Sequence, residues 1–339
     1  MTIFVKLRAR IFSVALGWLA GSCSFGLAAT TDALIEGAKR EGEVVYYASM
    51  NLSEANALIT EFEKSYPFVK VKLHRTGSEK LLTRVLTEAR ARKNFADVIQ
   101  TVEFSMHIFG RAGILARYVP QASSLYPKEF KEEGFWTTAY YNAYVTAYNT
   151  KLVAPRALPK TYEDLLDATW KDKLMIENTK ADWFAGMLQI MGPERGIKYK
   201  RALAKQQPSP REGHELLGQL VAAGEGVFDI NIPAASVERM KERGAPVDWT
   251  ALGPVPAIMV GIGVSNQAPH PNAAKLFLEF VLSRDGQKLM QTPGRLVARG
   301  DLANQQAAML KQLKIVPVNP GLAEKLDEYA KQLRSIFGS

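Results

Sequence analysis

The sequence predicts an α/β fold with a mainly parallel β-sheet. Two observations carry this prediction. Residues 43–99 alternate strand, helix, strand, helix, strand, and a polar loop follows each of the three strands. Such alternation is typical of parallel sheets covered by helices. The chain also has 339 residues, 47% of them hydrophobic, which is enough for two domains with their own cores.

The first strand and helix are predicted over residues 43–65. Residues 43–49 are a short run of mainly β-branched and aromatic residues, of the kind that favours a buried strand, and the run ends in polar Ser49. Ser53 is predicted to cap a helix, in which Ala55, Leu58 and Phe62 recur with helical spacing. The two elements therefore form the first strand-helix unit.

The second and third strands follow at residues 69–73 and 96–99, with a helix predicted to begin at Ser78 between them. In sheets of this kind, ligands bind at the carboxyl ends of the strands. We therefore expect a binding site at the loops 49–51, 76–78 and 100–103.

The middle of the chain is less regular. A strand is predicted at 144–148, helices at 181–191 and 194–204, and a proline-rich break at 206–210. A strand at 257–264 and a helix at 272–282 follow. The regular alternation of strands and helices breaks off in this middle part and resumes with the strand at 257–264. This order indicates that a second lobe is inserted into the first.

The N-terminal segment has the layout of a signal peptide. Lys6, Arg8 and Arg10 precede an apolar run at 11–20, and a small-residue stretch ends at Ala29. The apolar run is too short for a spanning helix, which needs roughly 20 residues. We predict that residues 1–29 are removed and that the protein is periplasmic.

Cys23 is the single cysteine of the sequence. The stretch 19–23 also resembles a lipoprotein processing site, so lipid attachment at Cys23 is the alternative to cleavage after Ala28 or Ala29. Either outcome excludes disulfides and thiolate chemistry in the mature chain.

Charge and motifs argue against several classes of function. Loss of the three signal-peptide cations reduces the net charge from +9 to +6, and the positive charge is dispersed, so nucleic-acid binding is not expected. The four histidines lack metal-ligand spacing, and no nucleophile elbow or phosphate-binding loop occurs. We expect no enzyme activity, no metal and no cofactor.

Eight short stretches, in this order, resemble the family 1 solute-binding proteins of bacterial ABC importers, in the ferric-binding branch. They are distributed over residues 41 to about 287, which is nearly the whole mature chain: 44–49 (VVYYAS), 62–67 (FEKSYP), 76–78 (TGS), 96–98 (ADV), 170–173 (WKDK), 244–247 (GAPV), 268–274 (APHPNAA) and 283–287 (SRDGQ).

The resemblance implies a two-lobed periplasmic-binding-protein fold, type II-like, with a hinge of crossing strands. Residues 30–117 and 253–300 would form lobe 1, 118–252 lobe 2, and 301–339 a helical segment packed on lobe 2. It implies a monomer that captures a small polar or anionic solute and delivers it to a membrane permease. An exported α/β hydrolase-like enzyme and the ligand-sensing subunit of a signalling receptor are the alternatives.

The sequence departs from the iron-binding members of that branch at two places. Those members carry adjacent iron-binding tyrosines where this chain has Asn231, Ile232 and Pro233 after an Ala-Gly-Glu stretch. Ferric iron would lose its hard phenolate ligands there. Residues 140–142 read Tyr-Tyr-Asn where relatives commonly have Ser-Gly-Arg, which favours stacking and neutral hydrogen bonds.

We expect ligand contacts from the polar residues at these positions, although each has an ordinary structural alternative. The polar residues in the loops after the strands could instead form turns or cap a helix, and the aromatic residues could instead pack in the core. Tyr140, Asn142 and Tyr144 should share one strand face and Tyr141 the other. If Glu103 faced the site and Ser78 received an anionic group, a zwitterion would fit. The candidates are Ser49, Asn51, Thr76, Gly77, Ser78, Thr101, Glu103, Tyr140, Tyr141, Asn142, Trp183 and Asn231.

Overall fold

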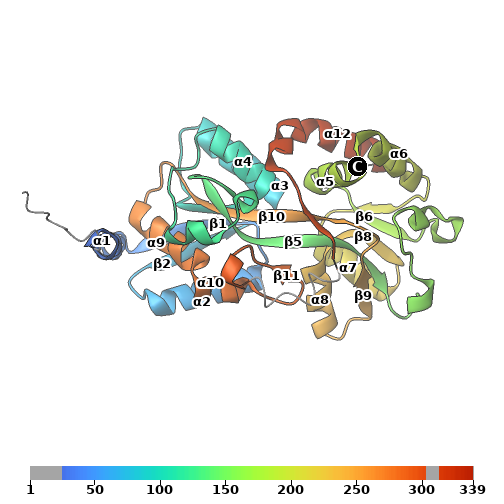
Figure 1. Cartoon of the computed structure of the whole chain (residues 1–339), viewed down its shortest axis with the longest axis horizontal. Coiled ribbons are helices and arrows are strands. Elements are labelled where there is room, and N and C mark those ends of the chain that lie inside the picture. The colour runs from blue at the N-terminus through green and yellow to red at the C-terminus, as the bar shows by residue number, and fades with distance from the viewer. Residues whose placement is uncertain (1–24, 303–312, 339) are drawn as a thin grey trace, which may run out of the picture.

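A computed structural model describes residues 25–302 and 313–338, with side chains from residue 32 onward. Its strands form one continuous path in the order β2-β1-β3-β10-β5-β8-β6-β7, with helices on both faces (Figure 1). Short strands β4, β9 and β11 pair with β5, and β12 pairs with β10. The molecule is elongated along this path (Figure 1).

The first lobe is built on β1, β2 and β3, which are parallel as predicted. Val44, Tyr46 and Tyr47 of β1 are fully buried, because this central strand has neighbours on both sides. Its elements are α1 (Phe25–Glu41), β1 (Glu43–Ala48), α2 (Leu52–Ser65), β2 (Lys70–Arg75), α3 (Ser78–Arg90), β3 (Val98–Val102), α4 (Glu103–Arg111), η1 (Gln121–Leu125), η2 (Lys128–Phe130), β4 (Lys131–Glu132), α9 (Pro271–Leu282), α10 (Arg284–Met290) and β11 (Arg295–Leu296).

Two long strands, β5 (Trp136–Asn149) and β10 (Val255–Val264), connect the lobes. They pair antiparallel with each other; β10 continues onto β3 of the first lobe, and β5 continues onto β8 (Phe228–Pro233) of the second. The predicted hinge of crossing strands is therefore confirmed.

The second lobe surrounds β6 and β8. Helices α5, α6 and α12 cover one face of its sheet, and α7 and α8 the other (Figure 1). Its remaining elements are η3 (Pro155–Ala157), η4 (Glu163–Leu166), η5 (Ala168–Trp170), β6 (Leu174–Glu177), α5 (Ala181–Met191), α6 (Pro193–Ala204), β7 (Ser209–Arg211), α7 (His214–Ala223), α8 (Ala234–Glu242), β9 (Val247–Thr250), β12 (Ile315–Pro317), η7 (Pro320–Lys325) and α12 (Leu326–Phe337).

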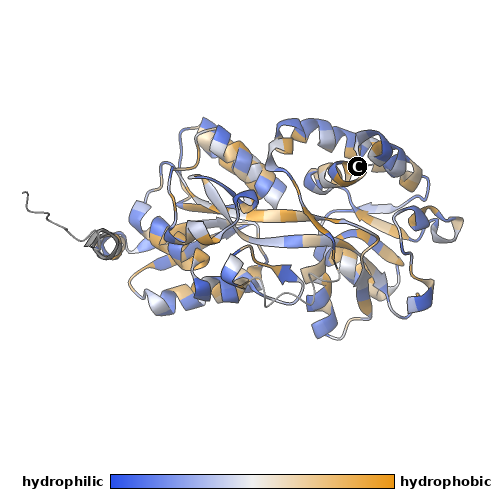
Figure 2. Ribbon diagram, viewed as in Figure 1, coloured by the Kyte–Doolittle hydropathy of each residue, from blue (hydrophilic) through white to orange (hydrophobic). Residues whose placement is uncertain are grey.

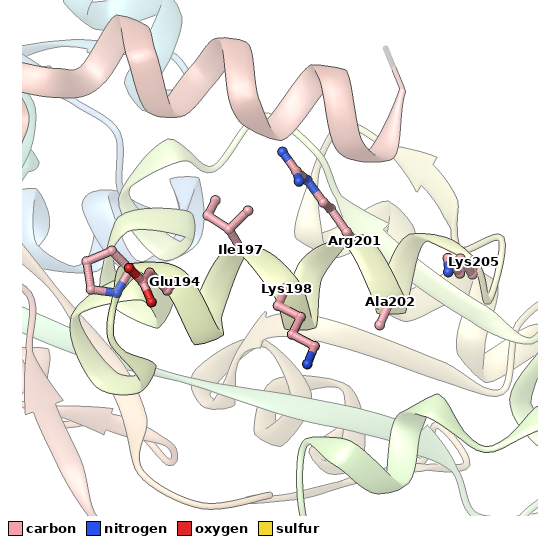
Figure 3. Close-up of a pocket in the computed structure, with 7 residues that line it drawn as sticks. Glu194, Ile197, Lys198, Arg201, Ala202 and Lys205 are labelled. Atoms are coloured by element: carbon pink, nitrogen blue, oxygen red, sulfur yellow. The ribbon is translucent and has the colours of Figure 1, made fainter.

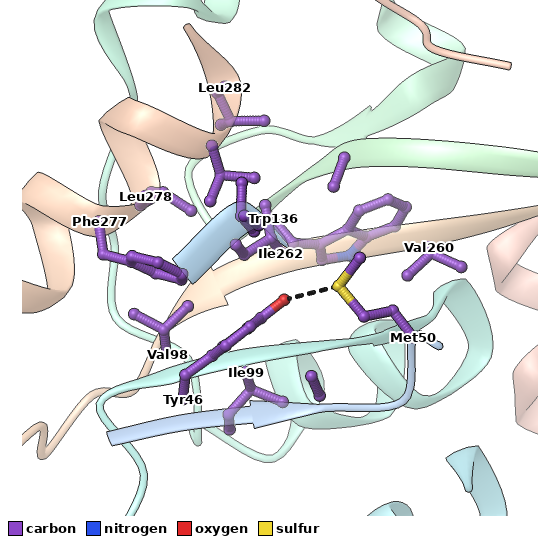
Figure 4. Close-up of a cluster of buried hydrophobic side chains, with 14 of the residues drawn as sticks. Tyr46, Met50, Val98, Ile99, Trp136, Val260, Ile262, Phe277, Leu278 and Leu282 are labelled. Carbon is purple, nitrogen blue, oxygen red and sulfur yellow. Dashed lines mark hydrogen bonds between the residues drawn. The ribbon is translucent and has the colours of Figure 1, made fainter. Parts of the chain in front are cut away.

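Apolar residues concentrate on the central strands and on the inner faces of the helices (Figure 2). In the first lobe, the ring of Phe277 lies 4.8 Å from Tyr46 and 4.9 Å from Phe62, between centroids. Figure 4 shows this core, with the Tyr46 hydroxyl directed at the Met50 sulfur. The contact between Tyr46 and Met50 holds the loop after β1 in place, and this loop carries the candidate residues Ser49 and Asn51.

Local details differ from the sequence prediction for identifiable reasons. Helix α2 begins at Leu52 and is capped by Asn51 rather than by Ser53, because the Asn51 side chain accepts a hydrogen bond from the Ser53 N–H. Asn51 is thus a cap as well as a candidate contact. The strand predicted at 144–148 is the end of the longer β5.

Two segments lie differently from the predicted lobe boundaries. Tyr118 and the Gln121 N–H both donate to Glu279 of α9, so the chain after residue 118 remains beside the first lobe until β5. At the other end, α12 contacts α5 and α6 of the second lobe, while η7 contacts α4 of the first.

No helix within residues 25–302 or 313–338 is long and apolar enough to cross a membrane. Residues 1–24, including Cys23, lie outside the described residues, so the signal peptide and the lipid attachment site remain predictions.

Candidate functional site

A cleft of about 670 Å³ lies between the two lobes, within the range of small-molecule sites. The loops after β1 and β2 form one wall, and the loops before α5, α7 and α8 form the other. Residues of β5, β10 and β11 also line it. Two of the three predicted loops, those after β1 and β2, thus meet at the cleft, as the parallel-sheet argument predicts. Residues 100–103 are instead the end of β3 and the start of α4, and of these only Val102 lines the cleft.

Helix N-termini from both lobes converge on this cleft. The first residues of α3, α7 and α8 line it, and none of these three helices has a side-chain cap. The first N–H groups of a helix lack partners within that helix and carry partial positive charge. Their convergence favours an anionic group in the cleft.

Seven of the predicted residues line the cleft: Ser49, Asn51, Thr76, Gly77, Ser78, Tyr140 and Asn142. The predicted alternation along β5 is also present. Tyr140, Asn142 and Tyr144 face the cleft, whereas Tyr141 packs on the other side against Phe130, with ring centroids 5.1 Å apart. Burial raises the pKa of Tyr140 to about 12, although Arg295 opposes the shift, so its hydroxyl is neutral at physiological pH.

The other predicted residues lie outside the cleft lining. Thr101 is buried in β3, where it pairs with Gly261 of β10. Trp183 belongs to the second-lobe core and contacts Lys200. Asn231 is fully buried and exchanges two hydrogen bonds with the Glu177 backbone, which tie β8 to β6.

Glu103 is fully buried at the start of α4 and does not reach the cleft. Burial, and secondarily the nearby Asp182 carboxylate, raise the pKa of Glu103 well above its usual value. A carboxyl group that is buried outside the cleft cannot pair with an ammonium group of a solute bound there. The zwitterion hypothesis that relied on Glu103 therefore loses its geometric basis.

Sequence reasoning missed the titratable residues of the cleft: Arg75, Lys80, Glu79, Glu177, Lys180, Glu212, His214, Glu215, Arg239 and Arg295. They come from five separate segments of the chain and form no linear motif. Only the pairing of distant strands brings them together, for example Arg295 of β11 opposite Asn142 of β5.

One buried ion-pair network crosses the cleft. Arg239 of α8 lies 3.1 Å from Glu54 of α2, and it also pairs with Glu215 at 2.5 Å. Glu54 in turn pairs with Arg295. A carboxylate of the first lobe therefore holds an arginine from the second lobe and one from β11.

A second ion pair crosses the cleft nearer the α3 N-terminus. The Lys180 ammonium lies 2.7 Å from Glu79. Burial favours neutral forms of both groups, but their attraction outweighs it, lowering the pKa of Glu79 and raising that of Lys180. Both are charged at physiological pH, and the pair joins the two lobes.

Several buried polar atoms in the cleft have no hydrogen-bond partner among the described residues. They are the Oδ1 of Asn142, the Nδ1 of His214, the Nε of Arg239, and the Nε and Nη1 of Arg295. Unpartnered buried groups are costly, and a bound molecule is one way to satisfy them. Burial, and secondarily Lys180, lower the pKa of His214, so its imidazole is neutral.

Within residues 25–302 and 313–338, no three His, Cys, Asp or Glu side chains form a cluster that could hold a metal ion. Another hollow lies on the outside of the second lobe along one face of α6, with Ile197 and Arg201 directed at the neighbouring helix (Figure 3). It is lined by α6 alone, and no loops converge there.

Similar proteins are solute-binding proteins. The iron uptake protein A1 of Synechocystis sp. is 24% identical over 73% of this chain and 73% of its own. The Fe(3+)-binding periplasmic protein of Serratia marcescens is 22% identical over 82% of this chain and 86% of its own. These relatives are transport proteins rather than enzymes.

Among solved structures, the periplasmic binding protein AfuA of Actinobacillus pleuropneumoniae, with fructose 6-phosphate bound, has a TM-score of 0.76 at 21% identity, over 87% of this chain and 98% of its own. Iron-bound HitA of Pseudomonas aeruginosa has a TM-score of 0.73 at 23% identity, over 87% and 99%. Both confirm the two-lobed fold. Since residues 50–288 also match the family, this chain belongs to the bacterial extracellular solute-binding proteins.

Proposed function

We propose that this protein is the periplasmic substrate-binding component of an ABC importer and that its solute is a small organic oxyanion. The observation that carries the proposal is the convergence of three helix N-termini without side-chain caps on a cleft that also contains Arg75, Arg239 and Arg295. Hinge closure would enclose the solute between the lobes, and a membrane permease would receive it.

Similar proteins bind two kinds of cargo, ferric iron and a sugar phosphate. Residues 231–233 supply no phenolate in this chain, and Asn231 is committed to the Glu177 backbone. Tyr140 and Tyr144 do line the cleft, but burial raises the pKa of each hydroxyl, which opposes the phenolate form. These features favour the oxyanion over the bare metal ion.

Thermal unfolding of the purified protein tests the proposal. The probes are fructose 6-phosphate, citrate and sulfate, with fructose as the neutral match and ferric chloride as the metal. A solute at 100 times its dissociation constant stabilises the folded state by about 2.7 kcal/mol. We expect stabilisation by an organic oxyanion and none by fructose. Stabilisation by ferric ion alone, or by no anion, would contradict the proposal.

A further inference from the structure

We propose that Arg295 and Asn142 form the recognition subsite of the cleft and that the solute is an oxyanion with a hydroxyl or ammonium group beside its acidic group. The inference rests on the proposed function and narrows the class of solute. It assigns the oxyanion to the Arg295 guanidinium and the neighbouring donor to the Asn142 amide oxygen.

Arg295 is a buried cation whose hydrogen bonds are incomplete. Its side chain is about 4% exposed and its guanidinium carbon lies 4.0 Å above the centroid of the Tyr140 ring. Nη2 pairs with Glu54, while Nε and Nη1 have no acceptor among the described residues. The ring and the carboxylate fix the guanidinium plane, so an oxyanion would bind a group that is already oriented.

Arg299, four residues later, shows what a structural arginine looks like in the same region. It is also buried, but its Nε donates to Asp301 and its Nη1 to the Leu282 carbonyl. Arg299 is not part of the cleft lining. The unpartnered nitrogens of Arg295 are therefore not a general property of buried arginines in this protein.

Asn142 supplies the second half of the subsite. It is directly opposite Arg295 in the antiparallel pairing of β5 with β11, so the two side chains lie on the same face as close neighbours. Its Oδ1 is buried and accepts no hydrogen bond from the described residues. An acceptor beside a cation requires a solute that carries a donor next to its negative charge.

Lobe closure completes the site. Glu54 holds Arg295 and simultaneously receives Arg239 from the second lobe, 3.1 Å away, so Glu54 is a positioning residue. The unpartnered atoms of Arg295 and Asn142 are inaccessible to solvent in the arrangement that the structure shows. A solute therefore reaches them when the lobes open, and closure buries it against both.

Isothermal titration with two matched pairs of probes tests the subsite. Citrate and glycolate carry a hydroxyl beside a carboxylate, whereas propane-1,2,3-tricarboxylate and acetate do not. We expect wild-type protein to bind each hydroxy acid on the order of 10-fold more tightly than its match, because one hydrogen bond is gained. Arg295→Gln should weaken binding of all four on the order of 10-fold to 100-fold. Asn142→Ala should abolish the preference for hydroxy acids.

Arg299→Gln is the matched control and should retain wild-type affinity for the hydroxy acids. Arg295→Lys keeps the charge but lacks Nε and Nη1, and it should also lose affinity, which serves the test if Arg295→Gln does not fold. Wild-type affinity in the Arg295 variants, or an unchanged preference in Asn142→Ala, would overturn the subsite alone. Failure of the wild type to bind any organic anion would overturn the proposed function as well.

Discussion

The cores of the two lobes are built on different principles. In the first lobe, Tyr46, Phe62 and Phe277 pack ring against ring, and the Tyr46 hydroxyl lies beside Gln100 and Met50. In the second lobe, Lys200 and Asp229 are fully buried, and each has a polar atom without a partner among the described residues.

The rings of the first lobe and the two buried charged residues of the second should affect stability in different ways. Glu103 of α4, in the first lobe, is also fully buried and has a raised pKa. Apolar rings contribute stability that does not depend on protonation, whereas a buried charge costs free energy that depends on pH. The first lobe should therefore lose the most when a ring is removed. The second lobe should gain when a buried charge is removed.

The largest effect should come from Phe277→Ala. Removing a fully buried ring that contacts two other rings should lower the free energy of unfolding by about 3–5 kcal/mol. Urea denaturation measures the change. Phe95→Ala, at a residue that is 50% exposed, is the control and should change stability by less than about 1 kcal/mol. Equal losses of unfolding free energy in the two variants would contradict the stabilising role assigned to the aromatic core.

Lys200→Met should have the opposite effect and raise the free energy of unfolding. The Lys200 ammonium lies 3.9 Å from the centroid of the Trp183 ring, and burial lowers its pKa far below the usual 10.5. Replacement by an apolar side chain of similar volume should stabilise the protein by about 1–4 kcal/mol at pH 7. Lys205→Met, on the exposed face at the end of the same helix, should be nearly neutral.

The stability gained by Lys200→Met should decrease as pH rises. The unfolded chain binds the Lys200 proton more tightly than the folded protein, so the wild-type penalty is present at neutral pH and declines as pH approaches 10.5. The advantage of Lys200→Met should be smaller at pH 9.5 than at pH 7. An advantage that grows with pH would contradict this account.

Asp229→Asn should change how stability responds to pH. Burial raises the pKa of Asp229 to about 8, so its stabilising contribution is complete below about pH 4 and is lost as pH rises through 8. Relative to Asp229→Asn, wild-type protein should lose about 2 kcal/mol between pH 6 and pH 8. Parallel stability curves for the two proteins over this range would show that the carboxyl group is already ionised.

The smallest effect should come from Glu79→Gln, which breaks the 2.7 Å ion pair between the lobes. Because Glu79 is 46% exposed, we expect a shift of about 1 kcal/mol toward the open form. Fluorescence energy transfer between dyes on the two lobes, without solute, measures it. Glu212→Gln is the control. It removes a more exposed ion pair, in which the Lys80 ammonium lies 3.6 Å from the Glu212 carboxylate, and it should leave the distribution of distances between the two dyes unchanged.

The sequence predicted the fold better than the site. Helical spacing placed α5 at Ala181–Met191, and strand alternation separated Tyr141 from Tyr140 and Asn142. These predictions succeed because periodicity is a local property. Cleft residues at strand ends could be anticipated for the same reason, through the topology of parallel sheets.

Contacts between distant segments could not be predicted in this way. Arg295 faces Asn142 only because β11 pairs with β5, and Arg239 meets Glu54 only because the fold brings α8 of the second lobe to α2 of the first. Glu103 directly follows a strand end, yet its side chain turns into the interior at the start of α4. Charge and position along the chain do not reveal which face of a loop a side chain will occupy.

The most direct test of the central claim is mass spectrometry of the small molecules released by denaturing protein purified from its native host cells. Wild-type protein should release an organic oxyanion that bears a hydroxyl or amino group, and Arg295→Gln should release much less of it, while Arg299→Gln matches wild type. Ferric iron without an organic anion, or a neutral solute recovered equally from all three proteins, would contradict the account.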